Sequence, residues 1–280
     1  MRRWLPWRSE PAEVSPAPAR RDAALEPQTS TLAGAAPIAG IPTVLPQGPG
    51  GIFVFESDAA DRINRARMGH LATLGLPLQG RRVLDVGAGI GKLARFFVER
   101  GCRVVCVEGR AENVAVIRER YNDVEAVVAD VQTDPLKAQG FFDVVFCYGL
   151  LYHTENPLAT LRNLASVCGD LMLIETIVCD FDRPVAALDD ESAGTWNQSL
   201  SPLAMRPSPA WVTMALSRLG FHVYMPHTVP DYEDYQFEWK NNGDHWRDEH
   251  PLRAVFVASR QALSNPVLRF VLAPNVAGEV

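Results

Sequence analysis

Three glycines spaced two apart follow a short apolar segment and could hold a nucleotide-like ligand. Residues 83–86 run directly into Gly87, Gly89 and Gly91. Where a strand turns into a helix, missing side chains let a ligand approach the backbone, and glycine tolerates the dihedral angles of such a turn. Dinucleotide-binding folds use G-x-G-x-x-G, whereas Lys92 stands here where the last small residue would be. The spacing therefore disfavours a dinucleotide.

Acidic residues mark the ends of three successive apolar segments. Asp85 lies two residues before the first glycine, and Glu108 and Asp130 close the next two segments. A carboxylate such as Asp85 would repel a pyrophosphate but can accept hydrogen bonds from a cationic ammonium group. Glu108 could accept both hydroxyls of an adenosine ribose, although NAD sites use the same device. The pattern indicates a positively charged ligand that contains adenosine.

A histidine and two tyrosines follow the fourth apolar segment, residues 142–148. In an open parallel sheet the ligand binds beyond the carboxyl ends of the strands, so Tyr148, Tyr152 and His153 should face the ligand and its reaction partner. His153 is the candidate catalytic residue, because an unperturbed pKa of about 6.5 suits removal of a proton from a hydroxyl. It could instead orient the loop, and the tyrosines could be packing residues.

The residues expected to contact the second substrate combine an aromatic stacking face with polar and charged groups. They are Tyr152, Glu175, Trp196, Asn197 and Arg206. Such a mixture suits a sugar or polyketide ring, although an ordinary polar loop fits it equally well. His245 and His250 are five residues apart, which matches no common zinc spacing, so no metal site is expected.

Strands and helices alternate between residues 81 and 177 and should position these side chains. Strands are expected at 81–87, 103–108, 124–129, 142–148 and 170–177, and helices at 90–100, 111–121, 135–139 and 156–167. A helix at 57–74, with Ser57 as its N-cap, precedes them. Such alternation produces right-handed crossovers and a mainly parallel sheet. The strand ends that carry the acids therefore face one crevice.

The alternation stops after residue 177. Ser208 and Pro209 open a further helix, as a hydroxyl N-cap followed by proline. Residues 178–207 are expected to form an insertion, 221–225 and 253–259 the sixth and seventh strands, and 226–252 a polar loop between them. The last two strands could close the sheet as an antiparallel hairpin. The predicted fold class is α/β, a doubly wound, seven-stranded, mainly parallel sheet.

The acid followed by G-x-G-x-G resembles the first motif of class I S-adenosylmethionine-dependent methyltransferases, which have a Rossmann-like fold. This resemblance covers about residues 81–260 and implies S-adenosyl-L-methionine as cofactor, with an acid at Asp130 that bonds the adenine amino group. The implied cofactor-binding residues are Asp85, Gly87, Ala88, Gly89, Gly91, Glu108, Gly109, Asp130, Val131 and Tyr148. The segment Gly-Leu-Leu-Tyr-His at 149–153 is similar to bacterial methyltransferases of glycan and natural-product pathways. It is more distantly similar to the tRNA wobble-uridine carboxymethyl transferase.

Outside the predicted methyltransferase domain, 81–260, the chain divides into three parts. Residues 1–48 are rich in proline and alanine and are expected to be a disordered tail. Residues 49–80 should form a helical cover, and 261–280 a C-terminal tail. The insertion 178–207 and the loop 226–252 are assigned to the acceptor side of the domain.

Composition restricts partners and location. The chain has 280 residues and a net charge of −6. Because a nucleic-acid site needs a basic face, which the RNA-modifying relatives have and this sequence lacks, nucleic acid is an unlikely partner by this criterion. No segment of about 18 apolar residues predicts a membrane helix, and five cysteines without a C-x-x-C pair indicate a reducing compartment. A cytoplasmic location is expected, and the oligomeric state is left open.

The sequence predicts an S-adenosylmethionine-dependent methyltransferase that acts on a small-molecule acceptor, with a sugar or natural-product hydroxyl preferred. Three alternatives stay open. They are a tRNA-modifying methyltransferase, an NAD-linked oxidoreductase, and a catalytically inert module that binds S-adenosylmethionine and works through its N-terminal tail.

Overall fold

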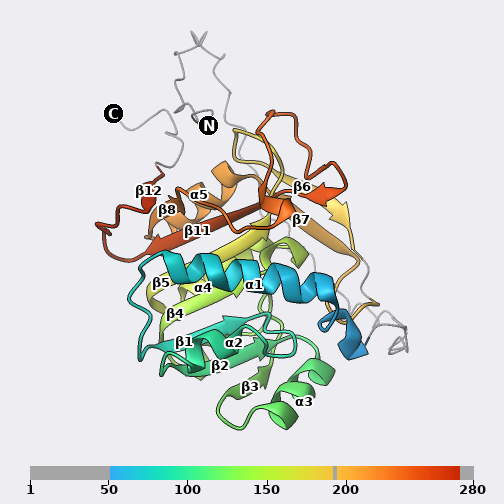
Figure 1. Ribbon diagram of the computed structural model, residues 1–280, viewed down its shortest axis with the longest axis vertical. Coiled ribbons are helices and arrows are strands. Elements are labelled where there is room, and N and C mark those ends of the chain that lie inside the picture. Colours follow the sequence, from blue (N-terminus) through green and yellow to red (C-terminus); the bar gives the residue numbers. More distant parts are fainter. Residues whose placement is uncertain (1–50, 192–193, 272–280) are drawn as a thin grey trace, which may run out of the picture. The chain divides into compact units, whose positions relative to one another are not determined.

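The computed structural model describes residues 51–191 and 194–271 (Figure 1). The expected disordered tail at 1–48 lies outside the described residues, as does the end of the expected C-terminal tail, 272–280. Within the described part, no helix has both the length and the apolar character needed to cross a membrane. The account below concerns the described residues alone.

A central sheet organises the fold, with strand order β12-β8-β11-β5-β4-β1-β2-β3. Its strands are β1 (Arg82–Val86), β2 (Arg103–Glu108), β3 (Glu125–Val128), β4 (Phe142–Tyr148), β5 (Cys168–Ile177), β8 (His222–Pro226), β11 (Arg253–Ser259) and β12 (Leu268–Phe270). The pairs among β1 to β5 are parallel, while β11 is antiparallel to both β5 and β8. The predicted doubly wound, mainly parallel sheet is therefore confirmed.

The sheet has one more strand than the seven expected. β12 pairs antiparallel with β8 and lies within the segment expected to be a C-terminal tail. Its three residues, Leu-Arg-Phe, are too few to show the alternation that identifies a strand from sequence. Leu268 is buried, so this short segment covers part of the apolar edge of the sheet.

Helices cover both faces of the sheet (Figure 1). They are α1 (Asp58–Thr73), α2 (Ala94–Val98), α3 (Ala111–Arg120), α4 (Pro157–Ala165) and α5 (Pro209–Arg218), with short 3-10 helices η1 (Gly51–Val54), η2 (Leu136–Gln139), η3 (Leu151–His153) and η4 (Glu233–Tyr235). Buried residues of α1, α2 and α3 share one apolar cluster with the sheet, and those of α4 and α5 share the other. Strands with both faces buried explain the continuous apolar segments seen in the sequence.

Two helix starts follow the expected capping rules. The Ser57 hydroxyl accepts a hydrogen bond from the Ala60 amide at 3.2 Å, and the Ser208 hydroxyl accepts one from the Trp211 amide at 3.1 Å. Each satisfies an amide that has no partner within its helix. These caps fix the first residues of α1 and α5, and α5 begins directly after the insertion.

The expected insertion, 178–207, contains a two-stranded hairpin. β6 (Ala186–Asp190) and β7 (Leu203–Pro207) pair antiparallel in a separate small sheet. The Met205 amide of β7 donates to the Thr154 carbonyl at 3.0 Å, which holds the hairpin against the segment after β4. In the expected loop 226–252, β9 (Trp246–Arg247) and β10 (His250–Pro251) form another short pair.

Candidate active site

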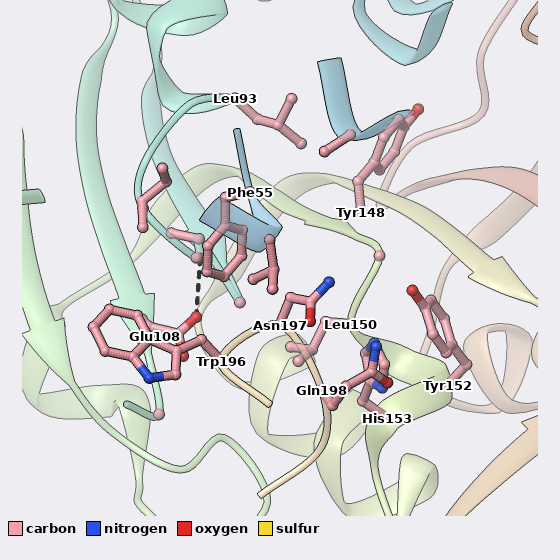
Figure 2. Close-up of a pocket in the computed structure, with 18 of the residues that line it drawn as sticks. Phe55, Leu93, Glu108, Tyr148, Leu150, Tyr152, His153, Trp196, Asn197 and Gln198 are labelled. Carbon is pink, nitrogen blue, oxygen red and sulfur yellow. Dashed lines mark hydrogen bonds between the residues drawn. The ribbon is translucent and has the colours of Figure 1, made fainter. Parts of the chain in front are cut away.

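A cavity of about 400 Å³ opens at the carboxyl ends of the parallel strands (Figure 2). It is lined by the ends of β1, β2 and β4, by the start of the chain's described part, and by residues 196–200 of the insertion. This volume falls within the range of about 300–1,000 Å³ that small-molecule sites occupy. Of the predicted site residues, it is lined by Gly87, Ala88, Gly89, Glu108, Gly109, Asp130, Val131, Tyr148, Tyr152, His153, Trp196 and Asn197.

The glycine bend forms one wall of this cavity. Gly87 and Gly89 have positive φ angles of 68° and 55°, which disfavour any residue with a side chain. A Cβ atom at Gly89 would lie 2.6 Å from the Phe55 ring, and one at Gly87 would lie 2.9 Å from Leu150. Gly91, by contrast, does not line the cavity, and its missing side chain lets Ile117 and Tyr121 pack closely.

Glu108 closes β2 with its carboxylate turned back to the glycine bend. Its Oε2 accepts a hydrogen bond from the Gly89 amide at 2.9 Å, and its Oε1 accepts one from the Arg110 amide at 3.0 Å. Burial raises the pKa of Glu108, while these hydrogen bonds oppose the rise. A carboxylate has about four acceptor positions, so Glu108 can still accept a hydrogen bond from a ligand hydroxyl.

Asp85 is buried beneath the bend and does not line the cavity. Its Oδ2 has no hydrogen-bond partner among the described residues, and only 2% of the residue is exposed. Burial raises the pKa of Asp85 to about 7, and the nearby Glu108 carboxylate adds to the rise. A buried carboxyl without a partner is costly, which marks this position as one that serves something other than stability.

Asp130, after β3, and Tyr148, at the end of β4, line the cavity on either side of the bend that follows β1. The Asp130 Oδ1 accepts a hydrogen bond from the Gln132 amide at 2.9 Å, which fixes the turn that carries Val131. The hydroxyl of Tyr148 is buried without a hydrogen-bond partner in the described part of the chain. Burial raises the pKa of Tyr148 further, so the hydroxyl stays protonated and can donate.

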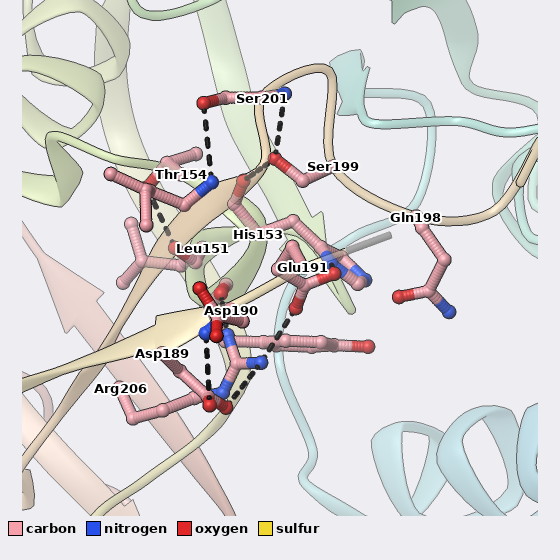
Figure 3. Close-up of polar contacts among 12 residues, drawn as sticks. Leu151, His153, Thr154, Asp189, Asp190, Glu191, Gln198, Ser199, Ser201 and Arg206 are labelled. Atoms are coloured by element: carbon pink, nitrogen blue, oxygen red, sulfur yellow. Dashed lines mark hydrogen bonds and ion pairs between the residues drawn. The ribbon is translucent and has the colours of Figure 1, made fainter. Parts of the chain in front are cut away.

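His153 contacts a carboxylate that the sequence analysis did not single out (Figure 3). Its Nδ1 lies 3.1 Å from the Oε2 of Glu191, which follows β6, and Arg206 of β7 lies 2.6 Å from the other oxygen of Glu191. Burial lowers the pKa of His153, and the Glu191 carboxylate offsets part of that shift. His153 is therefore a neutral imidazole near pH 7 at the cavity wall.

Arg206 and Glu175, both predicted to contact the second substrate, lie outside the cavity lining. Arg206 is buried and binds the Tyr152 carbonyl as well as Glu191, so it supports the wall from behind. Glu175 is completely buried, with its two oxygens held by Arg67 at 2.7 Å and Arg253 at 3.2 Å. Burial raises the pKa of Glu175, but the guanidinium groups of Arg67 and Arg253 and the hydroxyl of Tyr235 together lower it more.

Histidine, cysteine and acidic side chains do not form a cluster of ligands in the described residues. No group of three or more histidine, cysteine, aspartate or glutamate side chains lies close enough there to hold an ion. His245 pairs with Asp189 at 3.1 Å, and His250 with Asp234 at 3.3 Å, in separate contacts. His245 and His250 therefore contact different carboxylates.

A family model described as a methyltransferase domain matches residues 59–266, which include every element that lines the cavity except the segment before α1. The chain belongs to this methyltransferase family. The predicted membership in the class I S-adenosylmethionine-dependent methyltransferases is thereby confirmed, and with it the expected enzyme class and its cofactor.

Individual relatives of this methyltransferase differ in their acceptors. It is 32% identical over 162 residues to a tRNA U34 carboxymethyltransferase of Dichelobacter nodosus, a match that covers 55% of this chain and 49% of the relative. It is 32% identical over 115 residues to a ubiquinone biosynthesis O-methyltransferase of Cronobacter sakazakii, covering 40% and 46%. The chain spans about half the length of the curated relatives it matches.

A solved structure gives the same fold. The N-terminal domain of EvdMO1, crystallised with SAH and D-fucose, is 24% identical with a TM-score of 0.55, and the match covers 73% of this chain and 85% of that one. At this identity the likeness concerns the fold of the methyltransferase domain.

Several residues of this methyltransferase site were missed from sequence. Phe55, Arg67 and Arg253 all line the cavity, although they lie far apart in the chain. Phe55 precedes α1 and rests on Gly89, while Arg67 and Arg253 come from α1 and the start of β11. A motif search along the strands cannot find them, because each reaches the cavity through tertiary packing.

Proposed function

We propose that this methyltransferase binds S-adenosylmethionine along the glycine bend and transfers its methyl group to a hydroxyl of a small-molecule acceptor. One observation carries the proposal. A single cavity joins Gly87–Gly89, Glu108 and Asp130 to His153, so a cofactor bound by the first group ends beside a potential base. The four groups follow neighbouring strands of the sheet, in the order β4, β1, β2 and β3.

The residues on the cofactor side fit the chemistry of S-adenosylmethionine. Glu108 has acceptor capacity left for the ribose hydroxyls, and Asp130 with Val131 lies where the adenine would be held. Among the described residues, the hydroxyl of Tyr148 in the cavity wall and the Oδ2 of Asp85 beneath the glycine bend are buried polar groups without a hydrogen-bond partner. We assign Asp85 to the ligand's ammonium group, which it can reach through the bend or an ordered water.

Bound S-adenosylmethionine would supply an electrophilic methyl group on a cationic sulfonium. In the proposed reaction the acceptor oxygen forms a bond to the methyl carbon as the carbon–sulfur bond breaks, leaving S-adenosylhomocysteine. The acceptor proton passes to the Nε2 of His153 and then to solvent. Because the displacement needs alignment more than covalent assistance, the walls that hold both substrates and exclude water contribute much of the rate.

The acceptor side of the cavity supports a ring-shaped ligand with hydroxyl groups. Trp196 lies beside Glu108, toward the cofactor side, whereas Asn197 and Gln198 line the cavity nearer His153 and offer amide groups to a ligand (Figure 2). Tyr152 lies across from them, with its ring centroid 4.1 Å from that of His153. The D-fucose in the EvdMO1 crystal is consistent with a sugar, and the ubiquinone relative acts on an oxygen, as its name states.

A tRNA acceptor is the second candidate, because several curated relatives are named tRNA U34 carboxymethyltransferases. This candidate weakens the expectation that nucleic acid is no partner. Tight binding of bulk tRNA that falls steeply with salt would favour it, since phosphate contacts release counterions. Binding that is absent or insensitive to salt favours the small-molecule acceptor.

Calorimetry tests the cofactor site. We expect micromolar binding of S-adenosylhomocysteine and no binding of NADH, because the bend lacks the dinucleotide spacing. Glu108→Gln should weaken S-adenosylhomocysteine at least about tenfold, since a charged hydrogen-bond acceptor is lost. Glu125→Gln is the matched control. Glu125 is an exposed acid at the start of β3, whereas Glu108 lies at the end of β2 that faces the cavity. Equal affinities of the two variants would contradict the proposed site.

A further inference from the structure

The hairpin in the insertion brings a carboxylate to the candidate base. Glu191 follows β6 directly, and its Oε2 lies 3.1 Å from the Nδ1 of His153. Both side chains are nearly buried, with 4% of the Glu191 side chain and 9% of the His153 side chain exposed. The contact spans 38 residues of sequence and links the hairpin to η3.

The charge of Glu191 is fixed by its other neighbour. The Nη2 of Arg206 lies 2.6 Å from the Oε1 of Glu191 and 3.0 Å from Asp189. Burial alone would raise the pKa of Glu191, but hydrogen bonds from His153 and Arg206 hold it at about 2. The carboxylate is therefore ionised throughout the physiological range and can only accept hydrogen bonds.

An acceptor at Nδ1 determines the tautomer of the imidazole. Since an ionised carboxylate cannot donate, the proton of neutral His153 must lie on Nδ1, and Nε2 carries the free lone pair. The backbone around the ring is held as well: the His153 carbonyl accepts from the Ser199 hydroxyl at 2.6 Å, and the Tyr152 carbonyl accepts from Arg206. Ring position and tautomer are thus both set by residues of the insertion.

We propose that Glu191 is a positioning residue that keeps His153 in the Nδ1-protonated form and stabilises its imidazolium when Nε2 accepts the acceptor's proton. The proposal deepens the proposed function and rests on it for the identity of the base. Arg206 acts one step further away, by keeping Glu191 ionised and in place. This arrangement follows the logic of a base oriented by a buried carboxylate.

Other charges near His153 act in the opposite direction. Arg206 from β7 and Arg253 from β11 both disfavour the imidazolium, and burial does so more strongly than either. Glu191 is the carboxylate in direct contact that opposes them. Removing its charge should therefore lower the pKa of His153 below its already depressed value.

NMR titration of the histidine side chains in the ligand-free protein tests the proposal. The His153 signal is identified by its loss in His153→Gln. In Glu191→Gln we expect the His153 pKa to fall by about one unit or more, as for loss of an adjacent opposite charge. Glu191→Asp keeps a carboxylate and should restore most of the pKa. Asp190→Asn, one residue away on the same hairpin and exposed, should leave it unchanged.

The outcomes separate this proposal from the proposed function. A His153 pKa that is the same in wild type and Glu191→Gln, or a wild-type ring protonated on Nε2, would overturn the positioning role. Binding of S-adenosylhomocysteine, measured in parallel, reports on the cofactor site and on folding of each variant. A wild type that fails to bind it would contradict the proposed function, while the His153 titration would still decide the role of Glu191.

Discussion

Replacing Asp85 by asparagine should make the ligand-free protein more stable and its cofactor binding weaker. The carboxyl is fully buried and its Oδ2 lacks a partner in the described structure, so an amide of the same shape removes a group that is costly to ionise. Its pKa is about 7 in the folded protein, against an ordinary value of 3.8 for an aspartate. At 1.36 kcal/mol per unit this corresponds to at most about 4 kcal/mol.

The sign and the pH range of this effect follow from proton linkage. Between pH 3.8 and about 7 the folded state holds the Asp85 proton more tightly than the unfolded state. Wild-type stability therefore falls as pH rises through this range, and the full cost is present above it. An asparagine at this position cannot ionise, so the Asp85→Asn variant does not lose this stability. Its free energy of unfolding relative to the wild type should therefore be larger by about 2–3 kcal/mol at pH 8 than at pH 5.

Urea unfolding at both pH values measures this gain. Asp182→Asn, an exposed aspartate in the same protein, is the matched control and should show no such dependence. In calorimetry the wild type should release a fraction of a proton when S-adenosylhomocysteine binds near pH 7, because the ligand's ammonium favours ionised Asp85. The variant should release none and bind more weakly. An equal gain at both pH values, or unchanged affinity, would refute the reasoning.

Two further predictions concern the glycine bend and the buried ion pairs. Gly89→Ala should weaken S-adenosylhomocysteine binding well beyond Gly101→Ala, because both glycines have positive φ but only the first would meet an aromatic ring at 2.6 Å; equal effects in calorimetry would place the bend outside the site. Glu175→Gln should cost about 3–5 kcal/mol in urea unfolding near pH 7, since Arg67 and Arg253 would lose their shared partner. Because the folded pKa of Glu175 is lowered, this difference should shrink as pH falls through the carboxyl range, and a difference that grows there would contradict the argument.

The strands and the glycine bend could be predicted because local signals coincide there. The order of apolar segments and acids predicted β1 to β5 within a few residues, and the Ser57 and Ser208 caps were visible as single residues. In each case a residue type and its immediate neighbours carry the information.

The hairpin and the last strand could not be predicted in the same way. β6 reads Ala-Ala-Leu-Asp-Asp, with Leu188 60% exposed, so it lacks the alternation of a half-buried strand. Glu191 lies in the segment that was expected only to be an insertion, and its role depends on a contact with His153. Glu175 was expected to contact the second substrate because it lies near the end of β5. Its carboxylate instead pairs with Arg67 of α1 and Arg253 of β11 in the interior.

The ion cluster around Glu175 has a consequence for how the protein is made. It joins Arg67, near the start of the described chain, to Arg253, near its end, and both arginines also line the cavity. During synthesis the cavity wall is incomplete until β11 has left the ribosome and inserted between β5 and β8. The complete cavity wall therefore forms only after contacts between segments far apart in the sequence have formed.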